Sequence, residues 1–229
     1  MTDYVRLRKT MVESQLRPNK VIDQRVIGAF ESVPREAFAP QSLRGVAYMD
    51  EDLHLGDGRY LIEPMVLARL LQAAEIGPDD VVLDIGCGSG YSAAVIAKLA
   101  STVVALESDP ELAREATARL ADLGIDNAVV VQGPLEIGFP KQAPYQAVVL
   151  EGAVHEVPTA ILQQLAPNGR CVAVQQAGSP ASSFSGLKGG GVGHAVRMQR
   201  TGSNVASRIL FDAQVPPLPG FARQAAFVF

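Results

Sequence analysis

Three glycines in the stretch VVLDIGCGSGYSAA, residues 81–94, are the clearest candidates for ligand chemistry in the sequence. Gly86, Gly88 and Gly90 follow an apolar run typical of a buried strand and precede a run typical of a helix. Positions without a side chain let the backbone turn sharply and approach a ligand closely, and a helix N-terminus presents free N–H groups. The pattern therefore indicates a nucleotide-like ligand at the end of a strand.

The surrounding residues argue against a phosphate in this loop. A dinucleotide fingerprint needs glycine where this chain has Tyr91, and no lysine follows as it would in a P-loop. Glu107 ends the next predicted strand about 20 residues later, where doubly wound sheets place an acid that accepts hydrogen bonds from ribose hydroxyls. We therefore predict an adenosyl ligand without phosphates, S-adenosylmethionine. The alternative, a plain turn with a surface glutamate, leaves the coincidence of the two features unexplained.

Alternating strands and helices are expected to position these residues. Apolar runs predict strands at 81–85, 102–107, 128–132, 146–151 and 170–175. Helical patterns lie at 91–100, 109–124 and 158–166. Continuous apolar strands that alternate with amphipathic helices predict an α/β fold, with a doubly wound, mostly parallel Rossmann-like sheet and helices on both faces.

The flanking segments have other patterns. Helices are predicted at 4–17, 21–32 and 64–74, and 46–63 is predicted to be loop with some extended structure. Antiparallel strands are predicted at 185–200, 207–215 and 223–229, with the glycines at 189–191 in a hairpin loop. We expect a single domain over 1–229: a helical and loop cover (1–75), a cofactor-binding core (76–177) and an antiparallel C-terminal extension (178–229).

Composition limits the kinds of partner that the chain would bind. The net charge is −4 and no long basic run occurs, which argues against nucleic acid. No apolar run reaches the ~18 residues of a membrane span, and the polar N-terminus is unlike a signal peptide. Cys87 and Cys171 are read as reduced thiols, and no metal-type cluster occurs. We expect a cytoplasmic protein without a metal, whose oligomeric state the sequence leaves open.

Several segments together resemble the protein-L-isoaspartate O-methyltransferases. They are VLDIGCGSGYSAAVIAKL, VPREAFAP, AYMDEDLHLGDG, LEGAVHEVPTAILQQLAPNGR and VPPLPG, in the family's order over nearly the whole chain. The resemblance implies an enzyme that uses S-adenosylmethionine to esterify the carboxylate of damaged aspartyl residues in proteins and peptides. A carboxylate is already ionised at neutral pH, so the reaction needs no general base, and no catalytic side chain is assigned.

The expected cofactor residues lie in the glycine loop and at the neighbouring strand ends. They are Asp84, Gly86, Cys87, Gly88, Gly90, Tyr91, Glu107, Ser108, Pro134, Leu135 and Glu151. Pro134 stands where the family has an aspartate that contacts the adenine amino group, and proline offers neither an acceptor side chain nor an N–H. Adenine is therefore expected to rest on apolar packing by Leu135 and on a backbone carbonyl.

The expected substrate pocket departs further from the family. Its candidate residues are Tyr60, Leu61, Ile62, Glu63 and His155. The family typically reads Gly-Gln-Thr-Ile-Ser where this chain reads GRYLI, residues 58–62, so Ile62 replaces a serine beside the methyl-accepting group. Loss of a polar partner weakens the preference for a polar substrate. His155 is read either as a general base for a hydroxyl substrate or as a surface or capping residue.

Three hypotheses about the activity therefore stay open. The first is methylation of an isoaspartyl carboxylate on a protein or peptide. The second keeps the cofactor but changes the acceptor to a small molecule or to another protein group. The third is a homologue that binds the cofactor without catalysing transfer.

Overall fold

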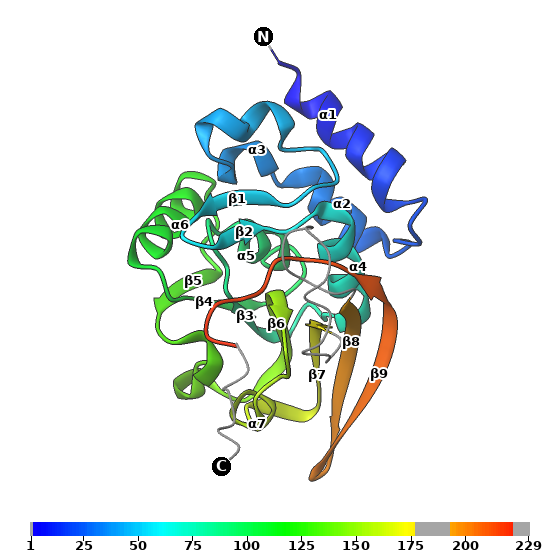
Figure 1. Ribbon diagram of the computed structural model, residues 1–229, viewed down its shortest axis with the longest axis vertical. Coiled ribbons are helices and arrows are strands. Elements are labelled where there is room, and N and C mark those ends of the chain that lie inside the picture. Colours follow the sequence, from blue (N-terminus) through cyan, green and yellow to red (C-terminus); the bar gives the residue numbers. More distant parts are fainter. Residues whose placement is uncertain (1, 177–192, 222–229) are drawn as a thin grey trace, which may run out of the picture.

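The computed structural model describes residues 2–176 and 193–221, with a seven-stranded sheet at its centre (Figure 1). The strands are β3 (Val81–Ile85), β4 (Thr102–Glu107), β5 (Ala128–Gln132), β6 (Tyr145–Val154), β7 (Leu165–Gln176), β8 (Gly193–Thr201) and β9 (Asn204–Ala213). Their order across the sheet is β5-β4-β3-β6-β7-β8-β9. The five strands from β3 to β7 are parallel to one another, and β8 and β9 are antiparallel to their neighbours. The predicted sheet with its antiparallel C-terminal strands is confirmed.

Helices cover the two faces of this sheet unequally. On one face lie α4 (Pro64–Ala74), α5 (Tyr91–Ile96) and α6 (Pro110–Asp122), whose buried apolar residues belong to the main core. The other face is covered by the short elements η3 (Leu135–Ile137), η4 (Pro140–Gln142) and α7 (Thr159–Leu162). The chain winds outward in opposite directions from β3 and from β6, so the switch point between them is where such sheets bind ligands.

An N-terminal layer packs over α4 and α5 (Figure 1, blue). It comprises α1 (Tyr4–Met11), the π-helical turn η1 (Val12–Leu16), α2 (Gln24–Ser32), α3 (Arg35–Phe38) and η2 (Gln41–Val46). The helix predicted from residue 21 begins instead at Gln24, because the Asp23 side chain accepts the Arg25 N–H at 2.8 Å and caps the helix there.

A short antiparallel hairpin occupies part of the segment predicted as loop. β1 (Leu53–Gly56) pairs with β2 (Arg59–Leu61), and the turn residues Asp57 and Gly58 both have positive φ. The acids that precede the hairpin bind the start of α4: Asp52 Oδ1 accepts the Glu63 N–H at 2.9 Å, and Asp50 Oδ1 accepts the Met65 N–H at 3.2 Å. These bonds tie both ends of the hairpin to the first turn of α4.

β6 is longer than the sequence predicted because another segment pairs with its end. Residues 214–221, which follow β9 and which we call the C-terminal strap, cross the carboxyl end of β6 (Figure 1, red). The Ala153 N–H donates to Pro216 O, and Ala153 O accepts the Leu218 N–H, both at 2.8 Å. Together with the pairing of Ala153 and Val154 with β7, these bonds extend β6 from Glu151 to Val154.

The helix predicted at 158–166 is shorter than expected. It ends at Leu162, and β7 begins at Leu165 because Tyr145 pairs with Leu165 and donates its N–H to Gln164 O at 2.8 Å. Residues 185–192, with the glycine run at 189–191, and the strand predicted at 223–229 lie outside the described residues. Within the described ranges, none of the helices has the length and hydrophobicity to cross a membrane.

Candidate active site

The loop after β3 holds its three glycines at the switch point of the sheet. Gly86, Gly88 and Gly90 have φ of +82°, +54° and +96°, a region that side chains rarely adopt. A Cβ on Gly90 would also lie 3.0 Å from the Ala116 Cβ of α6. The glycine spacing is therefore required by backbone conformation and, at Gly90, by helix packing as well.

Glu107, at the end of β4, lies fully buried against this loop. Its Oε2 accepts the Gly88 N–H at 2.7 Å, and its Oε1 accepts the N–H groups of Ser108 and Asp109 at 2.7 and 3.1 Å. Arg59 of β2 forms an ion pair with it, with Nη2 2.8 Å from Oε2 and Nε 3.3 Å from Oε1. Burial alone raises the pKa of Glu107, but Arg59 and the N–H donors outweigh burial and hold that pKa below its ordinary value.

Two further buried carboxyl groups lie together at the ends of β3 and β6. Burial raises the pKa of Asp84 to about 7. The Ser92 hydroxyl, which donates to Asp84 Oδ2 at 2.7 Å, opposes this rise. Burial and the neighbouring Asp84 charge raise the pKa of Glu151 well above its ordinary value. Apart from the hydrogen bond between the two carboxyl groups, Asp84 Oδ1 and Glu151 Oε1 have no donor. The pair therefore holds a proton near neutral pH and offers free acceptors.

Three side chains fill the space above the glycine loop. Besides its ion pair, Arg59 donates from Nη2 to Gly86 O at 2.7 Å. A Cβ on Gly86 would lie 2.6 Å from Leu218 Cδ1 and 2.9 Å from Arg59 Nη2. A Cβ on Gly88 would lie 2.9 Å from Leu55 Cδ1. Arg59, Leu55 and Leu218, which we call the crevice wall, thus occupy the place beside the loop.

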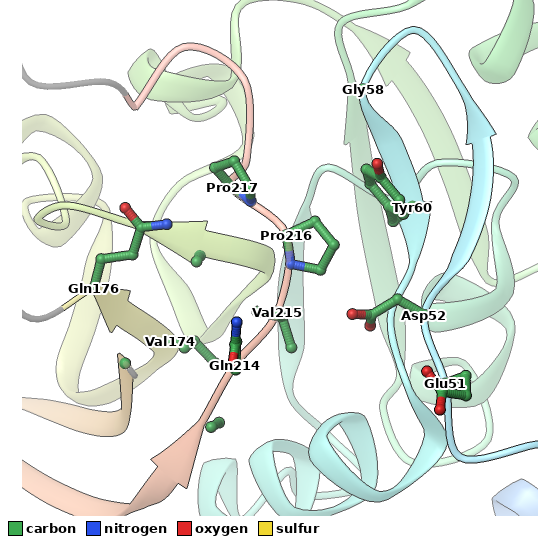
Figure 2. Close-up of a pocket in the computed structure, with 13 residues that line it drawn as sticks. Glu51, Asp52, Gly58, Tyr60, Val174, Gln176, Gln214, Val215, Pro216 and Pro217 are labelled. Carbon is green, nitrogen blue, oxygen red and sulfur yellow. The ribbon is translucent and has the colours of Figure 1, made fainter. Parts of the chain in front are cut away.

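A cavity of about 670 Å³ lies between the hairpin and the C-terminal strap (Figure 2). Asp52 and Tyr60 lie on one side of this cavity and face Val215 and Pro216 of the C-terminal strap. Glu51 adds a second carboxylate to the lining. Burial raises the pKa of Asp52 to about 6, so much of its charge is retained at neutral pH. The cavity therefore has an acidic side and an apolar side.

Two of the five predicted substrate residues line cavities. Tyr60 lines the larger cavity, where its ring makes an edge contact with His54. His155, directly after β6, lines a neighbouring cavity of about 480 Å³ together with Gly58 and residues of the C-terminal strap. The structure thus brings Tyr60 and His155 to the same edge of the sheet, at two cavities that share Gly58 and Pro217.

The other three predicted substrate residues lie elsewhere. Leu61 and Ile62 are buried in the main core, and the Ile62 carbonyl accepts a hydrogen bond from Arg35 Nη2 at 2.8 Å. The isoleucine in place of the family's serine therefore packs in the core and lines neither cavity. Glu63 is half-buried beside Asp52; burial first, and then the Asp52 charge, raise its pKa to about 7.

Tyr91 differs from the expectation in the direction of its side chain. Its ring is fully buried among the rings of Phe30 and Phe38, at centroid distances of 6.1 and 5.6 Å, and Arg35 Cζ lies 4.9 Å from its centre. The side chain therefore belongs to the N-terminal layer, and its backbone stays at the glycine loop. The sequence could not indicate this direction, because it depends on which helices cover α5.

The remaining predicted cofactor residues lie in the glycine loop or follow the ends of β4 and β5. The Ser108 hydroxyl lies 3.2 Å from Glu107 Oε1 and the residue is exposed. Pro134 is exposed at the end of β5, and Leu135 is buried in the second core cluster. Cys87 is buried, and burial raises the pKa of its thiol well above the ordinary value, so it is unreactive at neutral pH.

Sequence reasoning missed Arg59 and the strap residue Leu218. The sequence did contain a sign that Arg59 is unusual. It stands where the resemblance places a glutamine, and the residues that follow it, 60–62, are apolar or aromatic. A buried arginine needs an acid partner, and Glu107 was already singled out. Leu218 gave no signal, since only the pairing of the strap with β6 brings it to Gly86 and Gly152.

Comparison with known proteins gives one consistent family. The family model for protein-L-isoaspartate(D-aspartate) O-methyltransferases matches residues 6–183. The chain is 35% identical to the protein-L-isoaspartate O-methyltransferase of Herpetosiphon aurantiacus over 213 residues, which cover 93% of this chain and 90% of that relative. It is 41% identical to the one of Methanoculleus marisnigri over 168 residues, which cover 73% of this chain and 76% of that relative.

Two solved structures share the fold. One protein-L-isoaspartate O-methyltransferase has a TM-score of 0.78 at 23% identity, covering 93% of this chain and 67% of that chain. Another, from Plasmodium falciparum and in complex with S-adenosyl-L-homocysteine, has a TM-score of 0.74 at 18% identity, covering 96% of this chain and 100% of that chain. From the family match and the relatives, this chain belongs to the protein-L-isoaspartate O-methyltransferase family of S-adenosylmethionine-dependent methyltransferases.

Proposed function

We propose that the chain binds S-adenosylmethionine at the glycine loop and methylates the carboxyl group of damaged aspartyl residues in proteins or peptides. The observation that carries this proposal is the buried, ionised Glu107 that accepts the Gly88 N–H at the loop, in a chain of this family. An ionised acid in that place is a strong acceptor for two ribose hydroxyls.

The acids and glycines at the loop fit this cofactor in charge and in backbone conformation. Glu107 would hold the ribose, and the glycines would let the methionine part approach the backbone. The free oxygens of Asp84 and Glu151 would accept hydrogen bonds from the α-ammonium group. When bound, S-adenosylmethionine supplies the activated methyl group.

The cavity beside the crevice is the proposed place of the acceptor. Tyr60 and the strap residues Pro216 and Pro217 form its walls and would shield the acceptor from water. An acceptor carboxylate is ionised at neutral pH, so the chain has only to orient it and to exclude water. Placing the acceptor here makes the acids Glu51 and Asp52 neighbours of the peptide that carries it.

The proposed activity is tested by transfer of a tritiated methyl group to a peptide. We expect a base-labile methyl ester on a peptide with one isoaspartyl residue, and none on the same peptide with L-aspartate. Label found only in the small molecules of a cell extract would show a different acceptor. Binding of S-adenosyl-L-homocysteine without methyl transfer to the peptide or to the extract would show a homologue without catalysis.

The acidic lining predicts a preference among peptide substrates. Because Glu51 is exposed and half-buried Asp52 keeps much of its charge, a peptide with lysines next to the isoaspartyl residue should be methylated better than one with glutamates. Glu51→Gln should reduce that preference about two- to fivefold in kcat/KM, the size of an exposed ion pair. Glu13→Gln, an exposed acid of η1, is the matched control. The prediction is wrong if Glu51→Gln changes kcat/KM by the same factor for the lysine peptide and the glutamate peptide.

We also propose a cytoplasmic location. Both cysteines, Cys87 and Cys171, are buried and free, as is usual in a reducing compartment.

A further inference from the structure

Arg59 occupies the position that the cofactor ribose needs. Its side chain is 3% exposed, and its guanidinium forms two contacts with the Glu107 carboxylate and one with Gly86 O. A ribose held by Glu107 would have to take these same carboxylate oxygens. Both groups therefore compete for one acceptor.

The guanidinium also balances the negative charge of the acids around it. Asp84, Glu107 and Glu151 lie close enough that the Arg59 charge favours ionisation of all three. Without a nearby cation, the buried Glu107 charge and the remaining charge of the Asp84–Glu151 pair would be destabilising. The proposed cofactor carries its own ammonium and sulfonium charges, so it could replace the guanidinium as the counter-charge.

We infer that Arg59 is an internal competitor of the cofactor: it pairs with Glu107 when no cofactor is bound, and cofactor binding requires exchange of the guanidinium for the ribose hydroxyls. The inference rests on the proposed function. Leu218 and Leu55 flank Arg59 over Gly86 and Gly88, so the exchange also moves apolar side chains of the strap and the hairpin. Arg59 thus sets the affinity for the cofactor without contacting the acceptor.

The test is calorimetric titration of the full-length chain with S-adenosyl-L-homocysteine. Arg59→Gln, which restores the residue that the resemblance implies, should tighten binding by about tenfold to a hundredfold, the equivalent of one charge-assisted hydrogen bond. Arg59→Lys keeps the charge but loses the two-pronged geometry, so its affinity should lie between the two. The control Arg114→Gln removes an exposed arginine paired with Glu111 and should change affinity less than about twofold.

Thermal unfolding without ligand separates competition from a structural role. If Arg59 is a competitor that stabilises the ligand-free chain, Arg59→Gln should show opposite changes: a lower melting temperature and a higher affinity. A residue that only supports the fold would lower both. If Arg59→Gln is poorly folded, two other measurements give the same information. One is the affinity of Arg59→Lys. The other is the Nε–H resonance of Arg59 in the unmodified chain, which must shift during titration when the guanidinium leaves Glu107.

The outcomes are distinct. Equal or weaker binding by Arg59→Gln, while the unmodified chain binds S-adenosyl-L-homocysteine, overturns the inference and leaves the proposed function in place. No binding by any folded variant at millimolar ligand overturns both. Tighter binding with lower stability supports the inference.

Discussion

Replacing Glu107 by alanine is expected to lower the free energy of unfolding by about 3–5 kcal/mol, because removing one partner of a buried ion pair leaves the other charge uncompensated. The stranded group is Arg59, which is 3% exposed. The N–H groups of Gly88 and Asp109 lose their acceptor as well. Urea unfolding at neutral pH, followed by circular dichroism, measures this change.

A matched control and a second variant make this prediction specific. Glu111→Ala removes an exposed acid that is also paired with an arginine, and it should change stability by less than about 1 kcal/mol. The double variant Arg59→Ala with Glu107→Ala should lose less than the sum of its single variants, since neither charge is left alone. A loss in Glu107→Ala as small as in the control would mean that the pair is not a buried one in solution.

Replacing Asp84 by asparagine is expected to stabilise the chain at pH 8 by about 2–4 kcal/mol and to leave it nearly unchanged near pH 4. The pKa of Asp84 is about 7 in the folded chain against an ordinary 3.8, so folding retains a proton that the unfolded chain releases. Stability present below pH 3.8 is therefore lost as the pH rises toward 7. Asparagine removes this loss, because its amide keeps the shape and can donate to Glu151.

The same substitution should weaken binding of S-adenosyl-L-homocysteine about tenfold or more, because a neutral amide cannot balance the ammonium charge. In the unmodified chain, that affinity should rise with pH up to about 7, as the Asp84–Glu151 pair gives up its proton. Unfolding and titration are measured together at several pH values, with the exposed Asp126→Asn as control. Identical pH profiles for Asp84→Asn and the unmodified chain would contradict the account.

Most of the fold could be predicted because each strand has a local signature. Runs such as VVLDI and TVVALE are apolar apart from Asp84, Thr102 and Glu107, which is typical of strands covered on both faces, and β3 and β4 lie where those runs predict. The start of α2 at Gln24 follows from the local Asp23 cap, but two other boundaries that were wrong depend on distant partners. β6 extends to Val154 because the strap pairs with Ala153, and α7 stops at Leu162 because Tyr145 pairs with Leu165. No local pattern carries that information.

The candidate site also combines residues that spacing predicts with contacts that depend on distant segments. Gly86, Gly88, Gly90 and Glu107 were found from spacing, because parallel strands place their carboxyl ends at one edge. Other features of the site depend on how the N-terminal layer and the hairpin fold back over that edge. They are the side-chain direction of Tyr91, the burial of Ile62 and the pairing of Arg59 with Glu107. Such contacts join residues far apart in sequence, so spacing alone could not place them, although Arg59 could be recognised as a departure from the family's glutamine.

A crystal structure of the unmodified chain grown in excess S-adenosyl-L-homocysteine tests the central claim most directly. We predict the adenosyl group at the switch point between β3 and β6, its ribose hydroxyls on the Glu107 carboxylate, and the Arg59 guanidinium turned away from that carboxylate. A structure in which Arg59 still pairs with Glu107 and the ligand is absent from the glycine loop, or bound elsewhere, would contradict it.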